Sequence, residues 1–352
     1  MRKYFLFIIF LFLLCINRIF LCSCPTNGGI WNELDTLVPG GASHLLRRAK
    51  QLALGSRCDS TARKYGAGWK KFCHWTKNKF GATTFPAPPW QVALYMAEVS
   101  ITASSKSSIN APYYAIRWAH RLGGMSDPTD DPLPKSVLEG ALRSQKGNSS
   151  PRRVVSLSLV TDLCSKLSQS GIREVRLACM VSFAFAGFFR ISELLKLKVR
   201  DVAVFPSHLA VKITSSKTDV LGRGAEVILA KGETVACPIV NFTSLIEMHS
   251  AAPLPESFLF KNIRCNAFIP ESQMSYSRAR EELRYFLAKA GYAEDVCTWH
   301  SFRHGGASAA LEAGVSERLI GNHGRWRSEA GKNTYLHDNL KAQLSVSARL
   351  GI

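Results

Sequence analysis

The chain has 352 residues, of which 46% are hydrophobic and 20% charged, so it can bury the cores of two domains and is not disordered throughout. Its 45 lysines and arginines against 26 acidic residues leave a formal net charge of +19. This balance favours a polyanionic partner such as nucleic acid, because each basic residue placed on a phosphate releases a counterion, although secreted and ribosome-associated proteins are sometimes equally basic.

The first 24 residues have the shape of a secretory signal. Met1-Arg2-Lys3 precedes an apolar run over 4–15, which is short for a membrane span of about 20 residues. Sequons at Asn148 and Asn241 would be glycosylation candidates in an exported chain. A secreted basic glycoprotein is therefore one interpretation of this end of the chain.

Cysteine usage indicates the opposite compartment. Seven of the ten cysteines follow residue 24, and they are scattered singly, without CxxC pairs or Cys/His clusters at zinc spacing. Dispersed thiols fit a reducing compartment better than a disulfide framework. We expect no structural metal.

Residues 43–145 are predicted to form an all-helical domain. Apolar residues recur at helix spacing from residue 45, and Asp59-Ser60-Thr61 is a capping sequence for a second helix. A third helix is expected to begin at residue 92, a fourth to end at Gly123-Gly124, and a short one to span 135–143. Its aromatic residues are expected to form the core, whereas interleaved basic residues are the better candidates for phosphate contacts. These candidates are Arg47, Arg48, Arg63, Lys64, Lys70 and Lys71.

Residues 146–154 are polar, contain glycine and proline, and include Arg152 and Arg153, so we predict a basic linker that also contacts DNA.

The second domain, 155–352, opens with helices expected over 159–169 and 173–187. Alternating apolar residues predict a strand within 201–214 and a returning strand at 225–229. Helical periodicity resumes at 275–290, 301–314 and 316–323. The class is therefore α+β, mostly helical with a small antiparallel sheet.

Several residues of this second domain suit attack on a phosphate. Arg190 follows a phenylalanine-rich segment, where a buried guanidinium needs an anionic partner. His300 and Arg303 are three residues apart, so a helix would direct both at one phosphate. Trp326 precedes Tyr335 by nine positions. Arginines clamp non-bridging oxygens and a tyrosine hydroxyl is a nucleophile, so the set predicts phosphotyrosine chemistry on DNA.

The ordered set Arg190, Lys217, His300, Arg303, Trp326 and Tyr335 resembles the catalytic residues of tyrosine recombinases, the phage-integrase-like family. Ser-Lys-Thr-Asp around Lys217 and Gly-Arg-Trp-Arg-Ser around Trp326 are similar to recombinases of eukaryotic DIRS-type and Crypton-type mobile elements. The resemblance covers about 155–340. It implies a two-domain DNA clamp, in which an N-terminal core-binding (SAM-like) domain precedes the catalytic domain.

The resemblance also implies a role for each position. Arg190 and Arg303 would be the two arms of the clamp, and Lys217 would protonate the departing 5′ oxygen. His300 would assist proton transfer at Tyr335, the nucleophile. Trp326 would donate a hydrogen bond to phosphate or pack the tyrosine helix, because its indole is a donor only.

Some assignments stay open at this point. Glu193 either orients Arg190 or decorates a helix surface, and Lys212 and Lys231 compete with Lys217 if the hairpin register differs. The nine-residue interval favours Trp326 over His323. His304 is expected to point elsewhere on its helix and to be structural.

The expected function is site-specific recombination or integration of double-stranded DNA through a 3′-phosphotyrosyl intermediate, without metal, ATP or cofactor. Four protomers would cooperate through exchange of the C-terminal tail, which carries apolar residues from 340 to 350. Alternatives are relaxation of DNA like a type IB topoisomerase and a domesticated DNA-binding protein without catalysis. A nuclear enzyme has no use for an export signal, so we interpret residues 1–24 as an added or spurious leader. We expect nuclear location and no stable membrane association.

Overall fold

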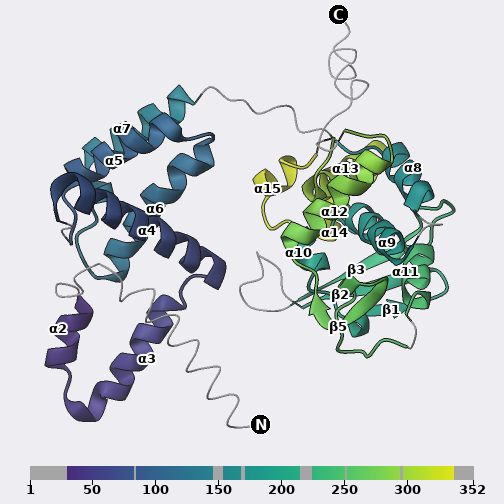
Figure 1. Cartoon of the computed structure of the whole chain (residues 1–352), viewed down its shortest axis with the longest axis horizontal. Coiled ribbons are helices and arrows are strands. Elements are labelled where there is room, and N and C mark those ends of the chain that lie inside the picture. Colours follow the sequence, from purple (N-terminus) through teal and green to yellow (C-terminus); the bar gives the residue numbers. More distant parts are fainter. Residues whose placement is uncertain are drawn as a thin grey trace, which may run out of the picture. The chain divides into compact units, whose positions relative to one another are not determined.

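The computed structural model describes residues 30–82, 85–145, 154–167, 171–214, 224–249, 252–293 and 296–336. The chain divides into two compact units, Met1–Ser149 and Ser150–Ile352 (Figure 1). The division falls in the segment expected as a linker, of which 146–153 lie outside the described residues. The two units are called the first and second unit below, and each is considered by itself.

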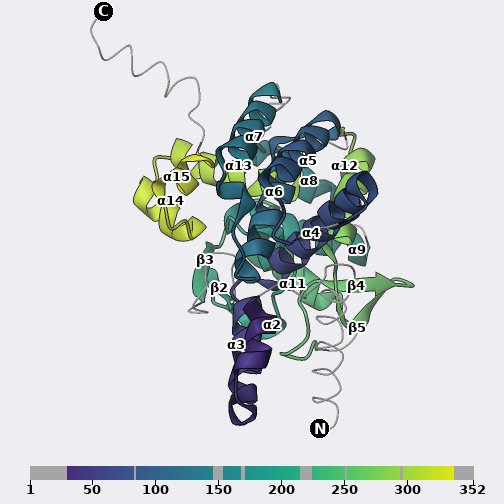
Figure 2. The ribbon, with the colours of Figure 1, turned by 90° about the vertical axis from the view of Figure 1, so that its left-hand side faces the viewer.

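The first unit is helical throughout its described part. It contains α2 (Ile30–Leu37), α3 (Ser43–Leu54), α4 (Asp59–Phe80), α5 (Pro89–Thr102), α6 (Lys106–Leu122) and α7 (Pro132–Ser144). Two short 3-10 turns, η1 (Gly40–Ala42) and η2 (Pro128–Asp130), join them. Helices α4 to α7 enclose a core that includes Phe72, Met96 and Ile116. Figures 1 and 2 show α2 and α3 as a helical hairpin, of which α2 was not predicted.

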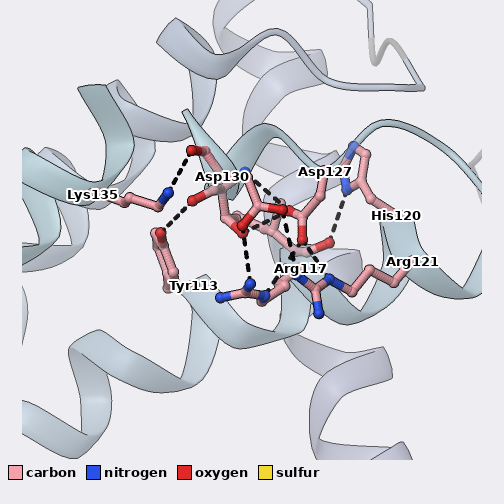
Figure 3. A network of polar contacts seen from close by, with 9 residues as sticks. Tyr113, Arg117, His120, Arg121, Asp127, Asp130 and Lys135 are labelled. Atoms are coloured by element: carbon pink, nitrogen blue, oxygen red, sulfur yellow. Dashed lines mark hydrogen bonds and ion pairs between the residues drawn. The ribbon is translucent and has the colours of Figure 1, made fainter. Parts of the chain in front are cut away.

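An ion-pair network fixes η2 against α6 in the first unit (Figure 3). Arg121 Nε donates to Asp127 at 2.8 Å, and Arg117 Nη2 donates to Asp130 at 3.0 Å. Lys135 Nζ, from α7, donates to the main-chain carbonyl of Asp130 at 2.5 Å. The turn between α6 and α7 is thus held by charge as well as by packing.

The second unit surrounds one buried helix. Its helices are α8 (Leu157–Leu167), α9 (Ile172–Ala186), α10 (Ile191–Leu194), α11 (Pro238–Glu247), α12 (Tyr276–Lys289), α13 (Trp299–Glu312), α14 (Glu317–Gly324) and α15 (Glu329–Asn333). Twelve of the fifteen residues of α9 are buried, so this helix is covered on every side. Helices α8, α11 and α13 pack against it. Figure 1 shows α9 enclosed by these neighbours.

Strands β1 (Val202–Val204), β2 (His208–Ile213) and β3 (Ala225–Ala230) form an antiparallel sheet in sequence order, after the 3-10 turn η3 (Val199–Asp201). The prediction of one strand across 201–214 was wrong, because the chain reverses at 205–207 and pairs Val204 with Leu209. Pro206 lies in this turn, and proline cannot donate to a strand ladder. The returning strand at 225–229 is confirmed as β3.

A second hairpin, β4 (Lys261–Arg264) with β5 (Ala267–Gln273), was not predicted. Its turn residues Cys265 and Asn266 both have positive φ, at 48° and 56°. That geometry is typical of a type I′ turn, which usually contains glycine. The expected helices of both units are otherwise present, with ends shifted by a few residues, and α11 and α15 are additional. The α+β class, mostly helical with small antiparallel sheets, is confirmed.

Candidate catalytic site

Arg303 lies at the centre of the candidate site. It is fully buried and donates to the main-chain carbonyls of Phe188 and Gly324, the latter at 2.5 Å. Its guanidinium carbon lies 4.4 Å from the ring centre of Trp326 and 5.1 Å from that of Tyr335. One arginine thus connects the end of α9, the end of α14 and the segment after α15.

Two glycines let α13 approach its neighbours closely enough to place Arg303. A Cβ atom on Gly305 would lie 2.1 Å from the carbonyl oxygen of Val155, and one on Gly306 would lie 2.1 Å from that of Phe185. The helix begins at a capping box in which Thr298 and Ser301 satisfy each other's backbone N–H groups. Sequence therefore fixes both where α13 starts and how near to α9 it lies.

Arg190 caps the short helix α10 and is paired with Glu193. Its Nη1 donates to Glu193 Oε1 at 2.7 Å, and its backbone N–H donates to Glu193 Oε2 at 2.9 Å. Glu193 is 2% exposed, which is incompatible with surface decoration. The Arg190 side chain keeps 17% of its surface exposed, so it remains accessible to a ligand.

Aromatic rings surround Tyr335. Its ring centre lies 5.1 Å from His300, 4.9 Å from Trp326 and 4.4 Å from His304, which stacks at an interplanar angle of 26°. The expectation that His304 points elsewhere was wrong. His300 and His304 are four residues apart, so α13 presents both on one face.

His323 takes a different position from Trp326. It hydrogen-bonds the carbonyl of Ala186 at 2.8 Å and packs edge-on against Phe188. Burial lowers its pKa, which keeps the ring neutral. Trp326, rather than His323, is the residue against Tyr335.

The electrostatics of the site are those of an anion-binding site. Burial, together with the neighbouring cations Arg190 and Arg325, lowers the pKa of Arg303 to about 9. Burial alone would raise the pKa of Glu193, but Arg325 and Arg190 outweigh it and leave that pKa below its ordinary value. Two of these three guanidinium groups are paired with Glu193, and Arg303 forms no ion pair with a carboxylate of the described residues, so a phosphate would supply the missing negative charge.

The structure places the other predicted residues as follows. Lys217 lies outside the described residues, between β2 and β3, and so do Arg152 and Arg153. The competing lysines, Lys212 and Lys231, are exposed. In the first unit, α3 carries Arg47 and Arg48, both exposed, and α4 carries Arg63, Lys64 and Lys71, exposed, and Lys70, half-buried. Residues 1–24 and the tail 340–352 also lie outside the described part.

Within the described residues, no helix is long and apolar enough to cross a bilayer, and no cluster of three or more His, Cys, Asp or Glu side chains could hold a metal ion. The seven described cysteines are free thiols.

Comparison with known proteins gives consistent matches. Residues 159–341 match the model of the phage integrase family. An integrase/recombinase xerD homolog of Selenomonas ruminantium is 25% identical over 296 residues, covering 82% of this chain and 84% of the relative. In fold, the chain is similar to XerH site-specific recombinase bound to difH substrate, with a TM-score of 0.58, 12% identity and 83% and 80% of the two chains covered.

Two other solved structures share this fold. The Tn1549 transposon integrase in complex with circular intermediate DNA has a TM-score of 0.58 and 14% identity, covering 85% of this chain and 97% of that one. A lambda integrase dimer bound to a COC′ core site has a TM-score of 0.51 and 15% identity, covering 84% and 77%.

Proposed function

The chain belongs to the phage integrase family of tyrosine recombinases, and on that premise we propose that it recombines double-stranded DNA at specific sites with Tyr335 as its nucleophile. The observation that carries the proposal is the position of Tyr335 in the described site. Its ring lies 5.1 Å from the buried guanidinium of Arg303 and is flanked by His300 and Trp326.

The reaction proceeds in two transfers of a phosphoryl group. Tyr335 Oη attacks phosphorus, the tyrosine proton passes to His300, and the bond to the 5′ oxygen breaks. Lys217 gives a proton to that oxygen, which leaves a 3′-phosphotyrosyl bond and a free 5′ hydroxyl. The 5′ hydroxyl of a partner strand then attacks the phosphorus and gives its proton to Lys217, while His300 returns a proton to the departing oxygen of Tyr335. The energy of the phosphodiester is retained in the covalent intermediate, so the cycle needs no ATP.

Arg190 and Arg303 stabilise the charge that develops on the non-bridging oxygens. Their positions are fixed before substrate arrives, Arg303 by main-chain carbonyls and Arg190 by Glu193. Preorganised donors stabilise a transition state more than a flexible side chain does. Glu193 therefore serves as the orienting residue for Arg190.

DNA is the partner in this proposal, and the basic residues of α3, α4 and the linker contact its phosphates. The solved structures with this fold include a transposon integrase, which supports recombination of a mobile element as the proposed setting. A nuclear location is proposed from this function alone. Four protomers would be linked by their C-terminal tails. An apolar groove of about 760 Å³ in the second unit, lined by Phe185, Ile228 and Leu319 among others, has the character needed to receive a tail.

The nucleophile is tested with nicked suicide DNA carrying candidate element ends. We expect wild type to form a denaturant-stable protein–DNA adduct and Tyr335→Phe to form none, because the attacking oxygen is absent. Tyr276→Phe, which removes an exposed hydroxyl from α12, is the matched control and is expected to form the adduct at the wild-type rate. An adduct with Tyr335→Phe contradicts the assignment, and relaxation of plasmid without exchange indicates a topoisomerase-like activity.

The tail is tested by deleting 340–352. We expect the shortened protein to bind a single DNA site as wild type does, but to form no tetramer on paired sites in analytical ultracentrifugation. An unchanged assembly on DNA excludes tail exchange.

A further inference from the structure

Arg325 has an unusual backbone conformation for its size. It caps α14 in the left-handed region, with φ 59° and ψ 37°, where a side chain with a Cβ is disfavoured. Its side chain is nevertheless 8% exposed and points inward. A glycine would adopt this backbone without strain, so the arginine side chain must have a reason to be there.

The contacts of Arg325 lead to the turn that carries Arg190. Its Nη2 donates to Glu193 Oε2 at 2.9 Å and to the carbonyl of Phe188 at 3.1 Å. Its Nη1 donates to the carbonyls of Gly187 at 3.1 Å and His323 at 2.7 Å. The guanidinium also lies 5.0 Å from the ring centre of Phe189.

Glu193 is thus shared between two arginines. Its Oε1 accepts from the Arg190 side chain, whereas its Oε2 accepts from Arg325 and from the Arg190 backbone. If Arg190 were the only cation paired with Glu193, the carboxylate would balance its whole positive charge. Because Arg325 is a second partner, part of the positive charge on Arg190 remains available to a ligand, while the hydrogen bonds to Glu193 still hold its side chain in place.

We propose that Arg325 is a positioning residue that balances the charge of Glu193, so that Arg190 is held in place and still available to the scissile phosphate. This inference rests on the proposed function, because it concerns the same phosphate. Arg325 itself acts through Glu193 and does not touch the DNA. It also couples the segment before Tyr335 to the turn after α9, since its backbone belongs to one and its contacts to the other.

The informative variant is Arg325→Gly, which removes the side chain and relieves the backbone strain. In single-turnover cleavage of suicide DNA, we expect the rate of adduct formation to fall about 10- to 100-fold, as for loss of a preorganised charge. DNA affinity should change less than about threefold, because ground-state phosphate contacts remain. Arg325→Lys keeps the charge without the planar fork and should recover part of the rate.

A double-mutant cycle separates this role from a structural one. In a Glu193→Gln background the charge to be balanced is gone, so Arg325→Gly should cost less than about threefold more. An equal loss in both backgrounds would falsify the proposal and leave Arg325 as a support for the carbonyls of Gly187 and Phe188. Arg318→Gln, which removes an exposed charge from α14, is the matched control for net charge and should cleave as wild type does.

A second measurement needs no DNA and no activity. In a carbon-13 NMR titration of the folded protein, the carboxyl pKa of Glu193 should rise in Arg325→Gly, because one of its two cationic partners is lost. An unchanged pKa overturns the inference, whatever the cleavage assay gives. If wild type forms no adduct, the proposed function fails, while the titration still decides the role of Arg325.

Discussion

The indole of Trp326 contributes packing and a hydrogen-bond donor, and the two contributions are separable. Its ring contacts Arg303 and Tyr335, but no described residue accepts a hydrogen bond from its buried Nε1. A buried donor without a protein acceptor is available to a ligand or a water molecule. In the proposed reaction that ligand is a phosphate oxygen.

We therefore expect Trp326→Phe to lower the cleavage rate at least about tenfold, because the ring stays but the donor is lost. Trp326→His, which restores an N–H group, should retain more activity than Trp326→Phe. Single-turnover adduct formation at saturating DNA measures both. Equal rates for Trp326→Phe and wild type would mean that packing alone is needed.

At the residue scale, sequence reasoning found residues whose chemistry and order are informative in themselves. Arg190 and Tyr335 both lie close enough to Arg303 to influence its charge, so residues far apart in the sequence are brought together. Arg325 was missed because its hydrogen bond to Glu193 is a tertiary contact between residues far apart in the sequence. His304 could have been found, since a histidine four residues after His300 shares its helix face.

The close packing of α13 on α9 is an element-scale property with a measurable cost. Gly306→Ala places a methyl group 2.1 Å from the Phe185 carbonyl and 2.8 Å from the Phe188 ring, so backbone has to move. We expect it to destabilise the second unit by about 2–4 kcal/mol, as overpacking of a core does. Thermal unfolding followed by circular dichroism measures this.

Gly321→Ala is the matched control for that substitution. It lies on α14 in the same unit, and its added Cβ would meet only Lys332 Cδ at an ordinary 3.6 Å. Helix propensity then favours alanine by up to about 1 kcal/mol. A loss of stability equal to that of Gly306→Ala would show that close approach is not the cause.

His120 makes the stability of the first unit depend on pH. Its Nε2 accepts from the Ala87 N–H at 2.9 Å, and its Nδ1 hydrogen-bonds the Ile116 carbonyl at 2.8 Å, so the ring is neutral. Burial lowers its pKa below 6.5. As pH falls, the unfolded chain therefore takes up the proton first. The contribution of neutral His120 to the stability of the first unit is fully present above about pH 6.5 and is lost as pH falls below it.

The decline should approach about 1.4 kcal/mol per pH unit for this one group. Urea unfolding between pH 7.5 and 5 measures it, with His120→Gln as the comparison, because glutamine accepts the hydrogen bond but does not titrate. The pH dependence of His249 and His323, whose pKa values are also lowered, is common to both proteins and cancels. Identical pH slopes for the two proteins contradict this account.

Helices and strands were predictable where the apolar residues recur with a clear period. They were poorly predictable where a turn determines the ends of a strand. The helices α4, α6, α9 and α12 were predicted from their apolar residues, and α6 and α12 also begin at serine caps, whereas the expected cap at Asp59-Ser60-Thr61 lies inside α4. The strand 201–214 divides because of a turn around Pro206, whereas alternation alone continues through it. The turn at 265–266 has no glycine and places Cys265, which seldom adopts positive φ, before Asn266, so β4 and β5 carried no recognisable signal.

At the scale of the whole molecule, the charge of +19 predicts strongly salt-dependent DNA binding. Each phosphate contact contributes about 0.9 to the slope of log affinity against log salt concentration. Replacing both Arg152 and Arg153 by glutamine should reduce that slope by about 2 and weaken specific and unrelated DNA alike. Fluorescence anisotropy between 50 and 300 mM salt, roughly the useful range, measures it.

An equivalent double substitution of Arg264 and Arg280, which no prediction places on DNA, serves as the control for net charge. If it changes the slope equally, the linker arginines act only through overall charge.

The division of the chain into two units was anticipated from composition, since the polar linker separates two stretches able to bury cores. The details of DNA contact depend on side chains whose placement composition does not encode.

The carbonyl of Phe188 receives hydrogen bonds from both Arg303 and Arg325, and a main-chain carbonyl is a group that no point substitution deletes. A substitution at Phe188 changes the packing of its buried ring against His323 and Trp326, but it leaves this acceptor in the chain. Insertion or deletion of a single residue between α9 and Arg190 would instead shift the anchor itself. The length of the segment between α9 and Arg190 should consequently stay constant among descendants of this gene.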